Sequence, residues 1–344
     1  MKRSSLSYFT GSFIFCIVGI VTAWLIGGAR AAITVGFLTM LETSLSFDNA
    51  VVNAGILKHW DEKWRRRFLV WGILIAVFGM RIVFPLLVVA VAGHVGPIQA
   101  LDLAINDPDE YSRILTSAHH EIAAFGGAFL MMVFLKFFVA RHKTEHWFKL
   151  IERPLTRLGK MEAIEAALTL VLVLLASTLL PAVEHQAEFV VAGVWGVITY
   201  ILAKGLSAFV SGDDEVSPHH HVIRQGIGGF LYLELLDASF SFDGVVGAFA
   251  MTNNLFIIAI GLGAGAMFVR SFTLLLVDRE TLGKFRYLEH GAFWAIGALA
   301  VIMLVGVEYH IPEFITGLIG AALIVLSIGS SLLANRRDGG MRSA

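Results

Sequence analysis

The chain has 344 residues, of which 57% are hydrophobic and 15% are charged. Soluble domains carry about 25% charged residues, and a soluble globule with a mean hydropathy of +0.76 would expose more apolar surface than water tolerates. Lipid must therefore be part of its solvent. A net charge of −1 gives no indication of a nucleic-acid partner. The single cysteine, Cys16, excludes a disulfide framework and a cysteine-based metal cluster.

Ten apolar segments are long enough to cross a bilayer, which takes about 20 residues in a helix. The predicted fold is an all-α polytopic membrane helix bundle that forms a single transmembrane domain over residues 1–344. The first apolar run follows Lys2 and Arg3, as in a signal peptide, but no polar segment follows it, so we interpret it as a span. The predicted spans are 8–27, 31–57, 68–93, 119–140, 163–183, 188–210, 226–251, 255–277, 288–307 and 312–334.

Lysine and arginine gather in the loops on one side of these spans. Basic clusters lie at 58–67, 141–160, 279–286 and 336–342, whereas the loop after the third span, 102–113, is mainly acidic. Basic loops face the cytoplasm. Both termini are therefore predicted to be cytoplasmic, in a multi-pass protein of the cell inner membrane.

The second and seventh spans contain related sequences. The run 41–52 and the run 236–247 are identical at six of twelve positions with a constant offset of 195, and Glu42 corresponds to Asp237. Five spans separate the copies, so the second copy is inverted in the membrane. We assign the first repeat to 30–140 and the second, inverted repeat to 226–307, a plan typical of secondary transporters.

Each copy continues in the same way. An arginine follows in the next helix, Arg81 or Arg270, and a glutamate stands at the head of the helix after that, Glu121 or Glu289. The glutamates are interpreted either as a proton relay, because a carboxylate in a low dielectric can exchange protons near neutral pH, or as helix-end residues stabilised by the helix dipole.

The acidic residues of the two related spans are predicted to hold a metal ion. An ionised carboxylate at the centre of a membrane helix costs about 2.5–3.5 kcal/mol, so it needs a compensating cation. One stripe at helical spacing is formed by Glu42, Ser46, Asn49 and Asn53, and the partner stripe by Glu234, Asp237, Ser241 and Gly244. Asp48 lies about 120° around an ideal helix from Glu42. Either the helix is interrupted between the two acids, or they serve different neighbours.

Oxygen ligands of this kind suit Mg²⁺, Ca²⁺ or Mn²⁺. The alternative is that Arg81 and Arg270 act as counter-ions and that the acids are structural. A further cluster, His219 to His221, is interpreted as either a metal-sensing loop or a solvated one. The chain has no Walker loop and no His-Glu-x-x-His pair, so neither ATP-driven transport nor zincin-type proteolysis is expected. No enzymatic activity and no organic cofactor are predicted.

The motif Glu42-x-x-Leu45-Ser46-x-Asp48-Asn49 and its second copy resemble the TerC family of tellurium-resistance-associated integral membrane proteins. That family includes the Alx-type manganese exporters and is similar to the LysE transporter superfamily. The second copy departs from the family pattern, because Asp237 stands where a glutamate is usual and Gly244 where an asparagine is usual. The resemblance implies Mn²⁺ export, with the ligands Glu42, Asp48, Asn49, Asp237 and Asp243.

The expected function is therefore export of a divalent cation between two inverted repeats, with lipid as the surroundings and protons as the coupling ion. Ser46, Ser241 and Glu234 would complete the polar shell of the site. Two alternatives stay open. One is a LysE-like carrier of another small solute, and the other is a non-transporting membrane scaffold in metal or tellurite stress resistance.

Overall fold

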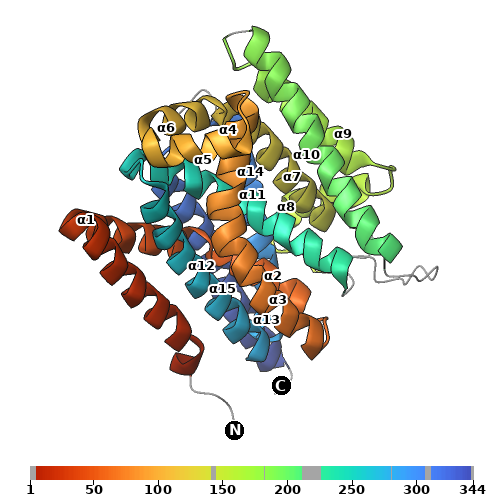
Figure 1. Ribbon diagram of the computed structural model, residues 1–344. Coiled ribbons are helices and arrows are strands. Elements are labelled where there is room, and N and C mark those ends of the chain that lie inside the picture. The colour runs from red at the N-terminus through yellow and green to blue at the C-terminus, as the bar shows by residue number, and fades with distance from the viewer. Residues whose placement is uncertain are drawn as a thin grey trace.

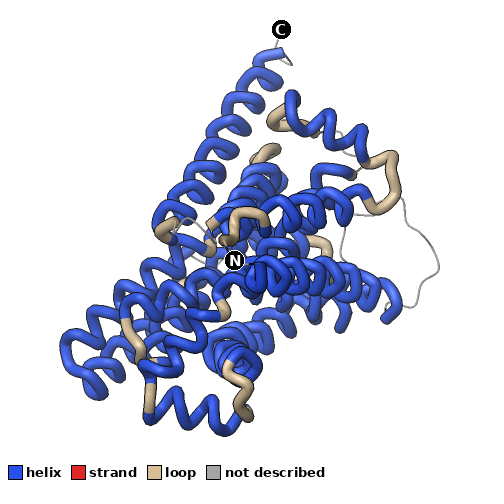
Figure 2. Tube along the Cα trace, turned by 90° about the horizontal axis from the view of Figure 1, so that it is seen from above, coloured by secondary structure: helices blue, strands red, loops and turns tan. Residues whose placement is uncertain are grey.

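The computed structural model describes residues 5–140, 145–181, 183–210, 226–279, 281–306 and 311–341. Within these ranges every regular element is a helix and no strand occurs (Figure 2). The predicted all-α helix bundle is therefore confirmed. His219 to His221 lie outside the described residues.

The elements follow one another as η1 (Ser5–Tyr8), α1 (Thr10–Leu45), α2 (Phe47–Leu57), α3 (Glu62–Leu74), η2 (Ile75–Val83), α4 (Phe84–Ala92), α5 (Pro97–Asn106), α6 (Pro108–Ser117), α7 (His119–Val139), α8 (Lys149–Leu158), α9 (Ile164–Ser177), α10 (Val183–Val210), α11 (Ile227–Met251), α12 (Leu255–Asp278), α13 (Thr281–Lys284), α14 (Leu288–Val305) and α15 (Glu313–Met341).

Seven helical stretches in the described part of the chain are long and apolar enough to cross a membrane. They lie in α1, in the continuous helix made by α3, η2 and α4, and in α7, α10, α12, α14 and α15. The predicted span 163–183 corresponds to α9, which has 14 residues. The acid-bearing α11 has 25 residues but is not among the seven. A multi-pass membrane bundle is thus supported, whereas the count of ten spans and the inverted repeat are not confirmed.

The first two predicted spans, 8–27 and 31–57, correspond in the structure to helices α1 and α2, which are separated at Ser46 and not at 28–30. Helix α1 runs through the predicted break and bends at Gly27 and Gly28, where Gly28 has a φ of +68°. The bend is visible in Figure 1, where α1 turns back toward the other helices. The next break comes at Ser46, whose φ and ψ of −98° and 18° end α1 and separate it from α2. The related helix α11 continues without such a break.

Arginine 81 lies in a stretch of unusual helical geometry. Residues Ile75–Val83 form a π-helix, η2, within the helix that α3 begins and α4 ends. Such segments are rare and occur often at functional sites. Arg81 is buried here, with 3% of its surface exposed.

The core surrounds α7, which is buried along most of its length and packs against α10 and α14. Large apolar side chains remain exposed on α1, α10 and α15, as expected for surfaces that face lipid. Figure 1 shows α5 and α6 at the end of the molecule opposite to the two termini. These two helices occupy the mainly acidic loop, so the loop has more structure than its sequence indicated.

Candidate functional site

A small cavity lies between the two related acidic helices. Its volume is about 20 Å³, enough for one water molecule or one ion. Both copies of the motif contribute to its wall, together with η2 and α12. The lining residues are Glu42, Ser46, Asn49, Asn53, Ala76, Arg81, Asp237, Ser241, Ala266, Val269, Arg270 and Thr273.

On the first side of the cavity, Glu42 forms a buried ion pair with Arg81. The distance from Arg81 Nη2 to Glu42 Oε1 is 2.5 Å, and both side chains are at most 4% exposed. Ser46 Oγ donates to the same carboxylate oxygen at 3.2 Å. Arg81 Nη1 donates to the backbone oxygen of Ala76 at 2.6 Å. The guanidinium thus bridges the end of α1 and its own helix.

On the second side, Arg270 lies between two acids of α11. Its Nη2 is 3.5 Å from Glu234 Oε1 and 3.5 Å from Asp237 Oδ2. Arg270 Nη1 donates to the backbone oxygen of Phe68 at 3.0 Å, and the guanidinium carbon lies 4.1 Å from the centre of the Phe68 ring. Each predicted counter-ion therefore contacts the acid of its own motif copy, and Glu234 joins Asp237 in the second pair.

The two sides are joined by one hydrogen bond between the motif copies. Asn53 Nδ2 donates to Asp237 Oδ1 at 2.7 Å. Three other oxygens in the wall are buried without a partner: Asn49 Oδ1, Asn53 Oδ1 and Ser241 Oγ. Because a buried polar atom without a partner costs about 1–3 kcal/mol, these oxygens mark a place where a ligand would be stabilised.

Glycines make room for the charged side chains. A Cβ atom at Gly265 of α12 would lie 2.4 Å from Glu42 Cβ, and one at Gly72 of α3 would lie 2.3 Å from Arg270 Nη2. A Cβ atom at Gly244 would lie 3.2 Å from Glu42 Oε2. The glycine that replaces the expected asparagine of the second motif copy therefore lies against the acid of the first copy.

The structure does not bring all the predicted ligands into this cavity. Asp48 is buried, but it accepts a hydrogen bond from the backbone of Asn49 and its Oδ2 lies near Gly320 of α15. It is absent from the cavity wall. The helix is interrupted at Ser46 and the two acids also face different neighbours, so the structure shows both of the features that the spacing had offered as alternatives. The side chain of Asp243 lies outside the described part of the chain.

No group of three or more histidine, cysteine, aspartate or glutamate side chains is placed to hold a metal ion within the described residues. A cation in the cavity would therefore depend on Glu42 and Asp237 together with amide and hydroxyl oxygens. Both carboxylates are occupied by arginine in this conformation. The set of five predicted ligands remains a prediction.

Residues 47–338 match the family described as "Protein of unknown function (DUF475)", which is more than half of the chain. The chain belongs to the DUF475 family. No curated protein and no solved structure matches it. The family match starts at Phe47 and so includes Arg81, Asp237 and Arg270 but not Glu42. It does not test the resemblance to the TerC family, which stays a prediction.

The two glutamates of this DUF475 protein that were interpreted either as a proton relay or as helix-end residues, Glu121 and Glu289, are absent from the cavity wall. Glu289, at the start of α14, forms an ion pair with Lys58, and both side chains are about one third exposed. Glu121, in the first turn of α7, has one carboxylate oxygen, Oε2, buried without a partner. Glu121 and Glu289 are therefore in different environments, and the structure gives them no shared role.

A buried carboxylate that sequence reasoning missed lies at α8. Glu152 has no exposed surface and accepts hydrogen bonds at 3.1 Å from the backbone of Trp147 and Phe148 and from Trp294 Nε1. His146 and His290 lie 3.6 and 3.8 Å away. Its position in the basic loop 141–160 gave no sign of burial.

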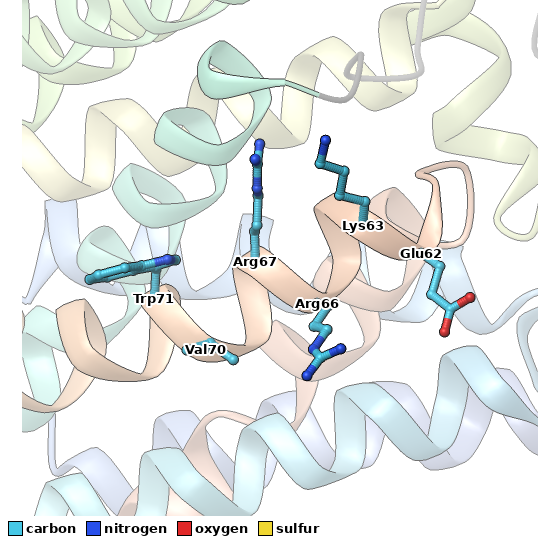
Figure 3. Close-up of a pocket in the computed structure, with 6 residues that line it drawn as sticks. All are labelled: Glu62, Lys63, Arg66, Arg67, Val70 and Trp71. Atoms are coloured by element: carbon cyan, nitrogen blue, oxygen red, sulfur yellow. The ribbon is translucent and has the colours of Figure 1, made fainter.

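A second hollow, of about 570 Å³, lies on the outside of α3. Figure 3 shows its lining: Glu62, Lys63, Arg66, Arg67, Val70 and Trp71. Lys63 and Arg67 point to one side of the helix and Arg66 to the other. The hollow holds part of the basic cluster that predicted the orientation in the membrane, and it is distinct from the acidic cavity.

Proposed function

We propose that this protein is a secondary transporter that exports a divalent metal cation, Mn²⁺ in the first place, across the cell inner membrane. The observation that carries the proposal is the buried cavity between the two motif copies, with carboxylates from both in its wall. Intramembrane ionisable residues mark ion pathways by default, because they are costly to keep in lipid.

The chemistry of the wall favours a hard cation. Beside the carboxylates of Glu42 and Asp237 lie the unpartnered oxygens of Asn49, Asn53 and Ser241. Carboxylate, amide and hydroxyl oxygens are ligands of Mg²⁺, Ca²⁺ and Mn²⁺. The proposal of manganese as the ion and of export as the direction comes from the resemblance to the TerC family.

The size of the cavity favours an ion over a larger solute. A volume of about 20 Å³ holds one ion or water molecule, whereas small organic ligands occupy pockets of about 300–1,000 Å³. A cationic amino acid, as carried by LysE-like transporters, would need a much wider opening. Every residue that lines the cavity is buried, so transport in this proposal requires the two halves to move apart alternately.

Protons are the proposed coupling ion. Glu121 is the better carrier of the two candidates, because its Oε2 atom is buried without a partner, whereas Glu289 is neutralised by Lys58. The N- and C-termini are cytoplasmic in this proposal, because the basic clusters at 58–67 and 336–342 favour the cytoplasmic side.

Cells that express the wild-type chain and are then exposed to manganese should contain less of the metal than cells without it, as measured by elemental mass spectrometry. Glu42→Gln and Asp237→Asn should abolish this difference, as should Asp48→Asn and Asp243→Asn if these acids are also ligands. Glu110→Gln is the matched control, because Glu110 pairs with Arg113 at the surface, away from the cavity.

Two results would contradict the proposal. One is a wild-type protein that is present in the membrane and leaves cellular manganese unchanged. The other is normal export by both Glu42→Gln and Asp237→Asn, which would leave the cavity without a transport role. A non-transporting scaffold in stress resistance would give the first result, together with metal or tellurite resistance that Glu42→Gln and Asp237→Asn retain.

A further inference from the structure

The carboxylate oxygens that would hold a transported ion are already bound to cations of the protein itself. Glu42 Oε1 accepts from Arg81 at 2.5 Å, and Asp237 Oδ2 lies 3.5 Å from Arg270. Glu234 lies 3.5 Å from the same arginine. All five side chains are at least nine-tenths buried, so water screens these attractions weakly. An incoming cation therefore competes with two guanidinium groups.

Each guanidinium has a second anchor that does not involve an acid. Arg81 Nη1 donates to the Ala76 backbone oxygen at 2.6 Å. Arg270 Nη1 donates to the Phe68 backbone oxygen at 3.0 Å, and its guanidinium lies over the Phe68 ring. A guanidinium displaced from its carboxylate would keep these contacts and would not need to reach water.

We propose that Arg81 and Arg270 are built-in cations that the transported ion displaces, and that they make the cavity selective for divalent over monovalent cations. The inference rests on the proposed function, because it concerns the same site. In the ion-free state the arginines neutralise the acids of their own motif copies. In the loaded state the ion takes the carboxylate oxygens of Glu42 and Asp237, together with the free oxygens of Asn49, Asn53 and Ser241.

Selectivity follows from the charge of the competitor. A monovalent ion would replace a guanidinium with equal charge and would give up its directed hydrogen bonds, which are among the strong ones in proteins. A divalent ion attracts the same carboxylates twice as strongly at equal distance. The oxygens Asn49 Oδ1, Asn53 Oδ1 and Ser241 Oγ accept no hydrogen bond from either guanidinium in this conformation, so they are additional ligands for a metal ion in the cavity.

The test is Mn²⁺ binding to the purified protein, measured by isothermal titration calorimetry in detergent. Arg81→Gln and Arg270→Gln should bind Mn²⁺ at least about tenfold more tightly than the wild type, the low end of measured couplings between close charges. Excess K⁺ should weaken Mn²⁺ binding to these variants and leave the wild type unaffected. Arg66→Gln, which removes a charge from the outer face of α3, is the matched control and should bind as the wild type does.

Two further variants distinguish displacement from loss of structure. Arg81→Lys keeps the charge and should stay close to the wild type in affinity and in insensitivity to K⁺. Arg81→Ala should bind tightly, and added guanidinium ion should return its affinity toward the wild-type value. A merely structural arginine would show no such rescue.

The inference is overturned if the wild type binds Mn²⁺ while folded Arg81→Gln and Arg270→Gln bind it equally well or more weakly, and K⁺ has no effect. In that case the proposed function survives. If neither the wild type nor any variant binds Mn²⁺, the proposed function fails and the inference fails with it.

Discussion

Gly72 in α3 is the position at which the smallest change should disturb the second ion pair. A Cβ atom there would lie 2.3 and 2.6 Å from the two terminal nitrogens of Arg270 and 2.4 Å from Glu234 Oε1. Non-bonded heavy atoms prefer separations of about 3.5–4.0 Å, so the guanidinium must move by about 1 Å or more. The pair stands at 3.5 Å already, and such a movement would break it.

The expected effect of Gly72→Ala is a clear loss of stability. Breaking a buried ion pair costs about 3–5 kcal/mol, while alanine regains about 1 kcal/mol of helix propensity over glycine. The net destabilisation is about 2–4 kcal/mol. Gly36→Ala is the matched control, because a Cβ atom at Gly36 of α1 meets nothing within 4 Å; this variant should be as stable as the wild type or slightly more so.

Thermal unfolding in detergent, followed by tryptophan fluorescence, measures the difference as a lowering of the melting temperature by several degrees. A double-mutant cycle identifies the cause. In Gly72→Ala/Arg270→Met the clash with the guanidinium is absent and only the contact with Glu234 Oε1 remains, so Gly72→Ala should cost less stability in the Arg270→Met background than in the wild type. Additive losses, or a Gly72→Ala variant as stable as Gly36→Ala, would refute the proposed link between this glycine and the ion pair.

Three other predictions test the rest of the fold. Gly28→Ala should lower stability by about 1–3 kcal/mol, because φ and ψ of +68° and −162° belong to a region essentially restricted to glycine; Gly11→Ala, also in open space, is the control, and equal melting temperatures would remove the argument. Glu152→Ala should expose residues 145–148 to limited proteolysis, because two backbone donors and Trp294 lose their acceptor; Glu162→Ala should not, and protection equal to the wild type in both would count against an anchoring role. In a Cys16→Ser background, Asn106→Cys should react with an impermeant maleimide in intact cells and Lys63→Cys only after permeabilisation; the reverse pattern would invert the proposed orientation.

The sequence by itself determined that this protein belongs in a lipid bilayer and which two segments carry acidic residues within apolar runs. Its apolar content requires lipid, and the repeated acidic motif marks two helices as the place where charge is buried. Both motif copies do reach one cavity in the structure. The stripe predicted from helical spacing, Glu42, Ser46, Asn49 and Asn53, lies together in the cavity wall even though the helix is interrupted at Ser46.

Tertiary packing decided which side chains meet around that cavity. Helical spacing left two possibilities for Glu42 and Asp48, and in the structure the helix is interrupted at Ser46 while Asp48 lies near Gly320 of α15, outside the cavity wall. Likewise, Arg81 and Glu42 are 39 positions apart, and their contact depends on how the π-helical stretch η2 directs the arginine. Gly72 lies against Arg270, and Gly244 and Gly265 lie against Glu42. The local sequence around these glycines does not reveal those contacts. Hydropathy and residue spacing describe a single helix. The ion pairs of Glu42 with Arg81 and of Asp237 with Arg270 join different helices, so only the tertiary structure could show them.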